Sequence, residues 1–204
     1  MGTYYNHTMN YSQIRTNQTQ FLSLTSLSVS EFDYLCSEFD VDWQRYYRYH
    51  TLEGKKRSFP SYNEHGNSQL PGTSIKLFFL LSYLKTNNLQ QQQAACFGLS
   101  QSKVSRVSNI LLIVLNQTLK RMGLSPIRNG YELKEQLESH PDCIFTYDGI
   151  ERGILRNSAM DAQEDEYSGK KKHTIKNLTL CDDNQLVLYL SATESGSTHR
   201  NGEP

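Results

Sequence analysis

The sequence predicts an α+β fold in which a helical first part is followed by a small sheet of about three antiparallel strands. Apolar residues recur at helical spacing up to residue 115, and a glycine at position 98 separates two of the helix candidates. Short runs of β-forming residues gather after residue 140. The length of 204 residues leaves room for one domain and part of a second.

The first 20 residues are polar and predict a disordered arm. Residues 21–68 follow as an N-terminal helical segment that ends in an aromatic, basic stretch and a linker. Ser28 and Glu31 have the spacing of a capping box at the start of a short amphipathic helix. Between Trp43 and Arg57, aromatic residues are interleaved with basic residues, and two interpretations of this stretch stay open. The stretch either tracks a DNA backbone or packs its rings on neighbouring helices.

Residues 69–125 predict a helix-turn-helix region. A buried helix capped by Thr73 comes first, and a short helix over residues 89–97 ends at Gly98, since glycine accepts the left-handed backbone found after helix ends. Ser100 then caps a third helix. The apolar residues of this third helix form one stripe at helical spacing: Val104, Val107, Leu111, Val114 and Leu115.

The opposite face of the third helix is polar and predicts a DNA-reading surface. Arg binds guanine through two hydrogen bonds, and Gln or Asn binds adenine in the same way. Neighbouring Lys and Arg residues contact phosphates, which position a protein without selecting a sequence. The alternative is a plain helical core without a ligand. The predicted DNA-binding residues are Gln101, Ser102, Lys103, Ser105, Arg106 and Asn109.

The charge distribution favours the DNA-reading interpretation. The formal net charge is zero, but residues 65–131 contain no Asp or Glu. This acid-free segment carries seven cations: Lys76, Lys85, Lys103, Arg106, Lys120, Arg121 and Arg128. Residues 132–166 reverse the balance, with ten acids against three bases. Two regions with opposite electrostatic tasks are therefore expected.

Cysteine spacing and hydropathy predict a cytoplasmic protein. The four cysteines lack the paired spacing of a zinc site, so reduced, buried thiols are expected. The N-terminus lacks the apolar core of an export signal, and no apolar run approaches the roughly 18 residues that a membrane span needs. A membrane partner is therefore not expected.

The predicted sheet has three strands, over residues 143–147, 173–181 and 186–191. Asp148 closes the first strand. In an antiparallel arrangement the third strand returns the chain to the Asp148 end of the sheet, and it carries His199 and Arg200 with it. Asp182 and Asp183 belong at the far end, where ordinary turn residues are expected rather than metal ligands.

Four segments together resemble a known family. They are FGLSQSKVSR from Phe97, DGIER from Asp148, YSGKKKHTIKN from Tyr167 and GSTH from Gly196. This set is similar to the DDE-type insertion-sequence transposases that carry an N-terminal helix-turn-helix. The resemblance extends over most of the chain, from about residue 27 to residue 199. YSGKKKHTIKN is long and specific, whereas the pattern D-G-x-E is weak by itself.

The resemblance implies that residues 140–204 form part of a ribonuclease H-like domain. In that family three carboxylates hold two Mg²⁺ ions, which serve DNA strand cleavage and transfer. Asp148 matches the first carboxylate, so a catalytic and metal-binding role is implied for it. At the same end of the sheet, the DNA backbone would be held by Lys170, Lys171, Lys172 and His173.

The chain departs from the family pattern near its end. Arg200 stands where the family has its second aspartate, and the sequence stops at Pro204 before a third carboxylate. A truncated DDE transposase that binds DNA without cutting it alone is therefore expected. The alternative is a non-catalytic helix-turn-helix regulator that represses transposition.

The implied partners are double-stranded DNA with the terminal inverted repeats of an element, and a complementing transposase fragment or a second copy. The implied location is the bacterial nucleoid.

Overall fold

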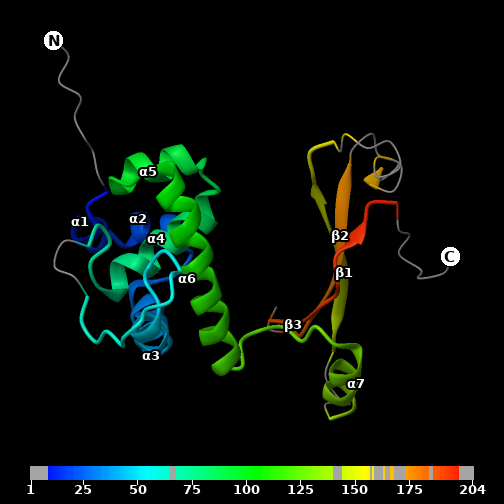
Figure 1. Cartoon of the computed structure of the whole chain (residues 1–204). Coiled ribbons are helices and arrows are strands. Elements are labelled where there is room, and N and C mark those ends of the chain that lie inside the picture. The colour runs from blue at the N-terminus through cyan, green and yellow to red at the C-terminus, as the bar shows by residue number, and fades with distance from the viewer. Residues whose placement is uncertain are drawn as a thin grey trace. The chain divides into compact units, whose positions relative to one another are not determined.

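The computed structural model describes residues 9–64, 68–139, 144–156, 158, 163, 166–167, 173–183 and 186–197. The chain divides into two compact units, Met1–Gly123 and Leu124–Pro204. The first unit is helical, and the second contains one helix and the sheet (Figure 1). Across the described residues the fold is mixed α+β, with seven helices and a small antiparallel sheet of four strands. The expected α+β class is confirmed.

The helices of the first unit share one hydrophobic core. They are α1 (Tyr11–Thr16), α2 (Gln18–Thr25), α3 (Val29–Tyr49), α4 (Gly72–Thr86), α5 (Gln90–Phe97) and α6 (Gln101–Arg121). The largest buried side chains of α2, α3, α4 and α6 include Phe21, Phe32, Phe39, Phe78, Phe79 and Leu111. Described residues from both predicted segments, 21–68 and 69–125, thus pack together within the first unit, which ends at Gly123.

The prediction of a disordered arm over the first 20 residues is wrong where the structure describes them. The side chains of Asn10 and Asn17 accept backbone N–H groups and cap α1 and α2. Ile14 and Phe21 are buried in the core, which fixes both helices against the rest of the unit. The polar composition of this segment therefore did not indicate two short helices that each bury one apolar side chain. Residues 1–8 lie outside the described part of the chain.

The helix predicted after Ser28 is confirmed and is longer than expected. The side chain of Ser28 accepts the N–H of Glu31, and the carboxylate of Glu31 accepts the N–H of Ser28 at 2.8 Å, which completes the capping box. The helix, α3, continues to Tyr49 because Trp43 and Tyr47 are buried and extend its apolar face.

The stretch predicted as a linker is tied to the core by a buried lysine. The ammonium of Lys76 on α4 is fully buried, and its Nζ donates to the carbonyl oxygens of Leu70 at 2.6 Å and Gly72 at 3.1 Å. It also forms an ion pair with the carboxylate of Glu64. Burial lowers the pKa of the Lys76 ammonium, and the ion pair opposes that shift. Leu70 itself is fully buried.

We expect Glu64→Gln to lower the free energy of unfolding by about 2 kcal/mol, because it removes the only anion paired with a buried cation among the described residues. Urea unfolding followed by circular dichroism measures this. In the control, Glu138→Gln disrupts a solvent-exposed pair with Lys134 and should change stability by less than about 0.5 kcal/mol. Equal small effects would show that the buried pair is not stabilising.

The glycine turn between α5 and α6 is confirmed. Gly98 adopts a left-handed backbone with φ of 64°, and its N–H donates to the carbonyl of Ala94. Ser100 then caps α6 by accepting the N–H of Lys103 at 3.3 Å. The predicted cap at the start of α4 is wrong, because α4 has Pro71 at its N-cap and Thr73 donates its hydroxyl to the carboxylate of Asp40 instead.

We expect Gly98→Ala to destabilise the first unit by about 1–2 kcal/mol, because the added Cβ strains the left-handed backbone. The readout is the urea midpoint of helix unfolding. Gly130→Ala is the matched control, since Gly130 begins a helix, has no positive φ and would bring its Cβ within 4 Å of no other group. A similar loss in both variants would argue against backbone strain at Gly98.

The second unit consists of α7 (Gly130–Glu138) and a sheet with β2 (Thr174–Cys181) in its centre. β1 (Thr146–Gly153) pairs antiparallel with one edge of β2. β3 (Val187–Leu190) and β4 (Glu194–Ser195) pair antiparallel with its other edge. The second and third predicted strands are thus present as β2 and β3, whereas β1 overlaps the first predicted strand only at Thr146 and Tyr147, and β4 is additional. No described strand pairs with the outer edge of β1.

The register of β1 corrects the expected place of Asp148. The strand begins at Thr146 and runs through Asp148, which pairs with Thr179 near the end of β2. Asp148 therefore lies inside a strand, near the turn that contains Asp182 and away from the start of β2. The apolar run over residues 143–147 suggested an earlier strand, but β1 shares only Thr146 and Tyr147 with it and continues through mostly exposed residues to Gly153.

Candidate nucleic-acid interface

The N-terminal half of α6 exposes most of the residues predicted to read DNA. The apolar stripe of α6 is buried as predicted, with no more than 5% of any of its five side chains exposed. The opposite face is consequently directed to solvent. Gln101, Ser102, Arg106 and Asn109 are exposed, whereas Lys103 and Ser105 are half-buried. Four polar side chains of complementary hydrogen-bonding chemistry therefore share the first turns of one helix.

Arg106 is the principal exposed cation of this surface. Its Nε donates to the carbonyl oxygen of Ser102 at 3.2 Å, which holds the side chain along the helix. No acidic side chain in the described part of the chain forms an ion pair with Arg106. Its positive charge is thus available to an anionic or acceptor-rich partner.

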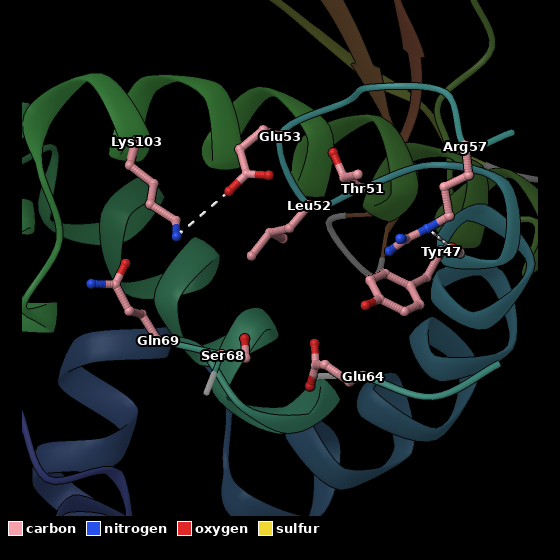
Figure 2. A pocket seen from close by; sticks show the side chains of 9 residues that line it. All are labelled: Tyr47, Thr51, Leu52, Glu53, Arg57, Glu64, Ser68, Gln69 and Lys103. Atoms are coloured by element: carbon pink, nitrogen blue, oxygen red, sulfur yellow. Dashed lines mark hydrogen bonds and ion pairs between the residues drawn. The ribbon is translucent and has the colours of Figure 1, made fainter. Parts of the chain in front are cut away.

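Lys103 has a different environment from Arg106. Its Nζ lies 3.5 Å from Oε1 of Glu53, and each side chain is only about a quarter exposed. The two residues stand at one side of an open cleft of about 410 Å³. Figure 2 shows Arg57 and Tyr47 across the cleft from Lys103. Lys103 therefore faces an internal acid, so a phosphate would have to compete with Glu53 for it.

Three of the seven cations in the acid-free segment are paired with acids from earlier in the chain. The pairs are Lys76 with Glu64, Lys103 with Glu53, and Arg121 with Glu38 and Asp42. Hydrogen bonds to Glu38 and Asp42 raise the pKa of the Arg121 guanidinium. Within α4 to α6 the cations without a described ion pair are Lys85, Arg106 and Lys120. The positive surface is therefore smaller than the sequence alone indicates.

The aromatic and basic stretch mainly supports packing. Trp43 and Tyr47 are 2% and 6% exposed, so neither ring is available to stack on a base. Lys76 lies 5.2 Å above the centre of the Trp43 ring, and Arg57 lies 4.5 Å above that of Tyr47. Tyr49 is the exposed exception, at 48%. Of the two interpretations, packing on neighbouring helices holds for the buried rings.

The described residues do not assemble the magnesium site that the resemblance implies. Asp148 is exposed, and its Oδ1 accepts the N–H of Gly149 at 2.7 Å. Glu151 is three positions further along the strand, so its side chain leaves the opposite face of the sheet. Among the described residues, no three His, Cys, Asp or Glu side chains gather in a group that could hold a metal. A two-metal site does not fit this arrangement.

The predicted cationic group beside Asp148 is not formed by the residues that can be placed. Lys170, Lys171 and Lys172 lie outside the described residues, as do His199 and Arg200. His173 is described, but it precedes β2, whereas the partner of Asp148 on β2 is Thr179. Six positions of strand separate them by about 20 Å. The expectation that His173 and Asp148 share one end of the sheet is therefore wrong.

The structure does join three of the segments that carried the resemblance. Thr174 follows His173 in the segment YSGKKKHTIKN. Its Oγ1 donates to Oε1 of Glu151, in the segment DGIER, at 2.9 Å. Gly196 is packed so closely that a Cβ there would lie 2.5 Å from Oγ1 of Thr174 and 2.5 Å from the carbonyl oxygen of Glu166. Only glycine fits, which the sequence pattern alone did not reveal.

Comparison with protein-family models, curated proteins and solved structures finds no match for this chain. No helix in the described ranges is long and apolar enough to cross a membrane. Cys36, Cys96 and Cys181 are free thiols in the described part of the chain, and burial raises the pKa of Cys36 to about 11.

Proposed function

We propose that this chain is a DNA-binding protein of the DDE-transposase type, which reads the ends of its own DNA element through a helix-turn-helix made by α5 and α6. The observation that carries the proposal is the exposed set of Gln101, Ser102, Arg106 and Asn109 on the first turns of α6. A left-handed glycine turn and a serine cap place this helix directly after α5.

The chemistry of the exposed set suits the major groove. A helix enters this groove with its N-terminal turns toward the base edges. Arg106 offers a forked donor that matches the two acceptors of guanine, and Asn109 or Gln101 offers the donor and acceptor that adenine requires. Ser102 suits either a base edge or a phosphate. The buried stripe on the other side of α6 fixes the orientation of all four residues.

The resemblance to DDE transposases supports the choice of partner, which is double-stranded DNA carrying the terminal inverted repeats of the element. Strand cleavage by such a protein needs several carboxylates around two Mg²⁺ ions. Asp148 supplies one, and the described residues bring no metal-binding group to it. We therefore propose that the chain alone binds without cutting. Transposition would need carboxylates from a complementing fragment or second copy, and the alternative role is repression by occupancy of the ends.

We expect Arg106→Ala to reduce the preference for terminal-repeat DNA over a scrambled duplex by about 5- to 150-fold, since one bidentate base contact is worth roughly 1–3 kcal/mol. Fluorescence anisotropy with labelled duplexes measures both affinities. Arg106→Lys keeps the charge but loses the fork, so it should lose most of the preference as well. Lys120→Ala, at the far end of α6, is the charge-matched control and should leave the ratio unchanged. Equal loss on both duplexes for Arg106→Ala would contradict the assignment.

We expect the purified chain to retard terminal-repeat DNA without nicking it in the presence of Mg²⁺, because the described residues gather no group of acids that could hold two metal ions. A supercoiled plasmid that carries the repeats provides the nicking assay. Asp148→Asn should bind DNA as the wild type does. Nicking by the wild type that disappears in Asp148→Asn would contradict binding without cutting, and would assign a catalytic role to Asp148.

A further inference from the structure

We propose that the turn between Thr51 and Arg57 is a second DNA-contacting element beside α6, in which Lys55 and Lys56 bind phosphates of the backbone. This inference rests on the proposed function, because it adds a contact to the same interface. It gives a role to two basic residues, Lys55 and Lys56, that neither the core nor the helix-turn-helix uses.

The turn is rigid enough to present these two lysines in a fixed place. The N–H of Thr51 donates to the carbonyl of Lys55 at 2.8 Å, and the N–H of Lys55 donates back to Oγ1 of Thr51 at 3.1 Å. The N–H of Gly54 donates to the carbonyl of Thr51 at 3.0 Å. His50 and Lys56 then form an antiparallel bridge that closes the base of the turn.

Two contacts fix the turn on the flank of α6. Gly54 lies against Ile110, so closely that a Cβ there would come within 3.0 Å of Cδ1 of Ile110. The adjacent Glu53 pairs with Lys103. Arg106 is three positions after Lys103 and four before Ile110, and residues at these spacings are neighbours on a helix surface. The turn is therefore attached along the edge of the surface that exposes Arg106.

The net charge of the turn is positive where a DNA backbone would pass. The carboxylate of Glu53 is balanced by Lys103. Arg57 is committed to its own segment, because its Nε donates to the carbonyls of Tyr47 and His50. Lys55 and Lys56 are exposed and form no ion pair with a described residue. Phosphates beside a major-groove helix are the polyanion that such a pair of ammonium groups suits.

The test is the salt dependence of DNA binding by the double variant Lys55→Ala, Lys56→Ala. Each phosphate contact contributes about 0.9 to the slope of log affinity against log salt, so the slope should become shallower by about 1.8. The loss should be alike on terminal-repeat and scrambled duplexes, because phosphates carry no sequence information. Lys55→Arg, Lys56→Arg keeps both charges and should restore the slope.

The control removes two exposed lysines elsewhere, Lys85→Ala and Lys134→Ala, and should leave the slope within about 0.5 of the wild type. A wild-type slope in the double variant at Lys55 and Lys56 would overturn this inference while leaving the proposed function intact. Failure of the wild-type chain to bind any duplex in low salt would instead refute the proposed function, and with it this inference. A urea midpoint equal to that of the wild type checks that the variant is folded.

Discussion

The burial of one face of α6 is the constraint on which the candidate interface depends. Val104, Val107 and Leu111 lie in the aromatic core formed by α2, α3 and α4, so the rotation of α6 about its axis is fixed. Whatever is not in the stripe must face outward or lie at its flanks. The packing of α6 on the core therefore determines which of its side chains are exposed. A change in the core that rotated α6 would displace Arg106 without touching it.

Tertiary ion pairs redistribute the charge that the linear sequence displays. A segment of 67 residues without acids suggests a uniformly cationic surface. In the folded unit, acids from α3 and from the following turns reach into this segment and neutralise Lys76, Lys103 and Arg121. The pairs also link α3 to the end of α6. Charge along the chain thus reports composition, whereas the field around the protein depends on which segments the core brings together.

Several local features of the fold were predictable from sequence, whereas ion pairs between distant segments were not. The capping box at Ser28, the glycine turn at 98 and the cap at Ser100 each depend on residues within a few positions, and all are confirmed. The pair between Glu53 and Lys103 joins residues 50 positions apart, and no spacing rule predicts it. The predicted position of the strand that contains Asp148 was wrong. Both faces of this strand are largely exposed, so the alternation of apolar residues specifies its position weakly.

The outer edge of β1, with which no described strand pairs, has a consequence for solubility. An unpaired strand edge offers its N–H and C=O groups to any extended chain, which is the usual route to fibrous self-association. β1, between Thr146 and Gly153, carries Asp148, Glu151 and Arg152, and two glycines interrupt its side-chain surface. Charges and glycines of this kind discourage a second copy from extending the sheet. The strand with mostly exposed side chains thus also carries features that oppose edge-to-edge pairing with a second copy.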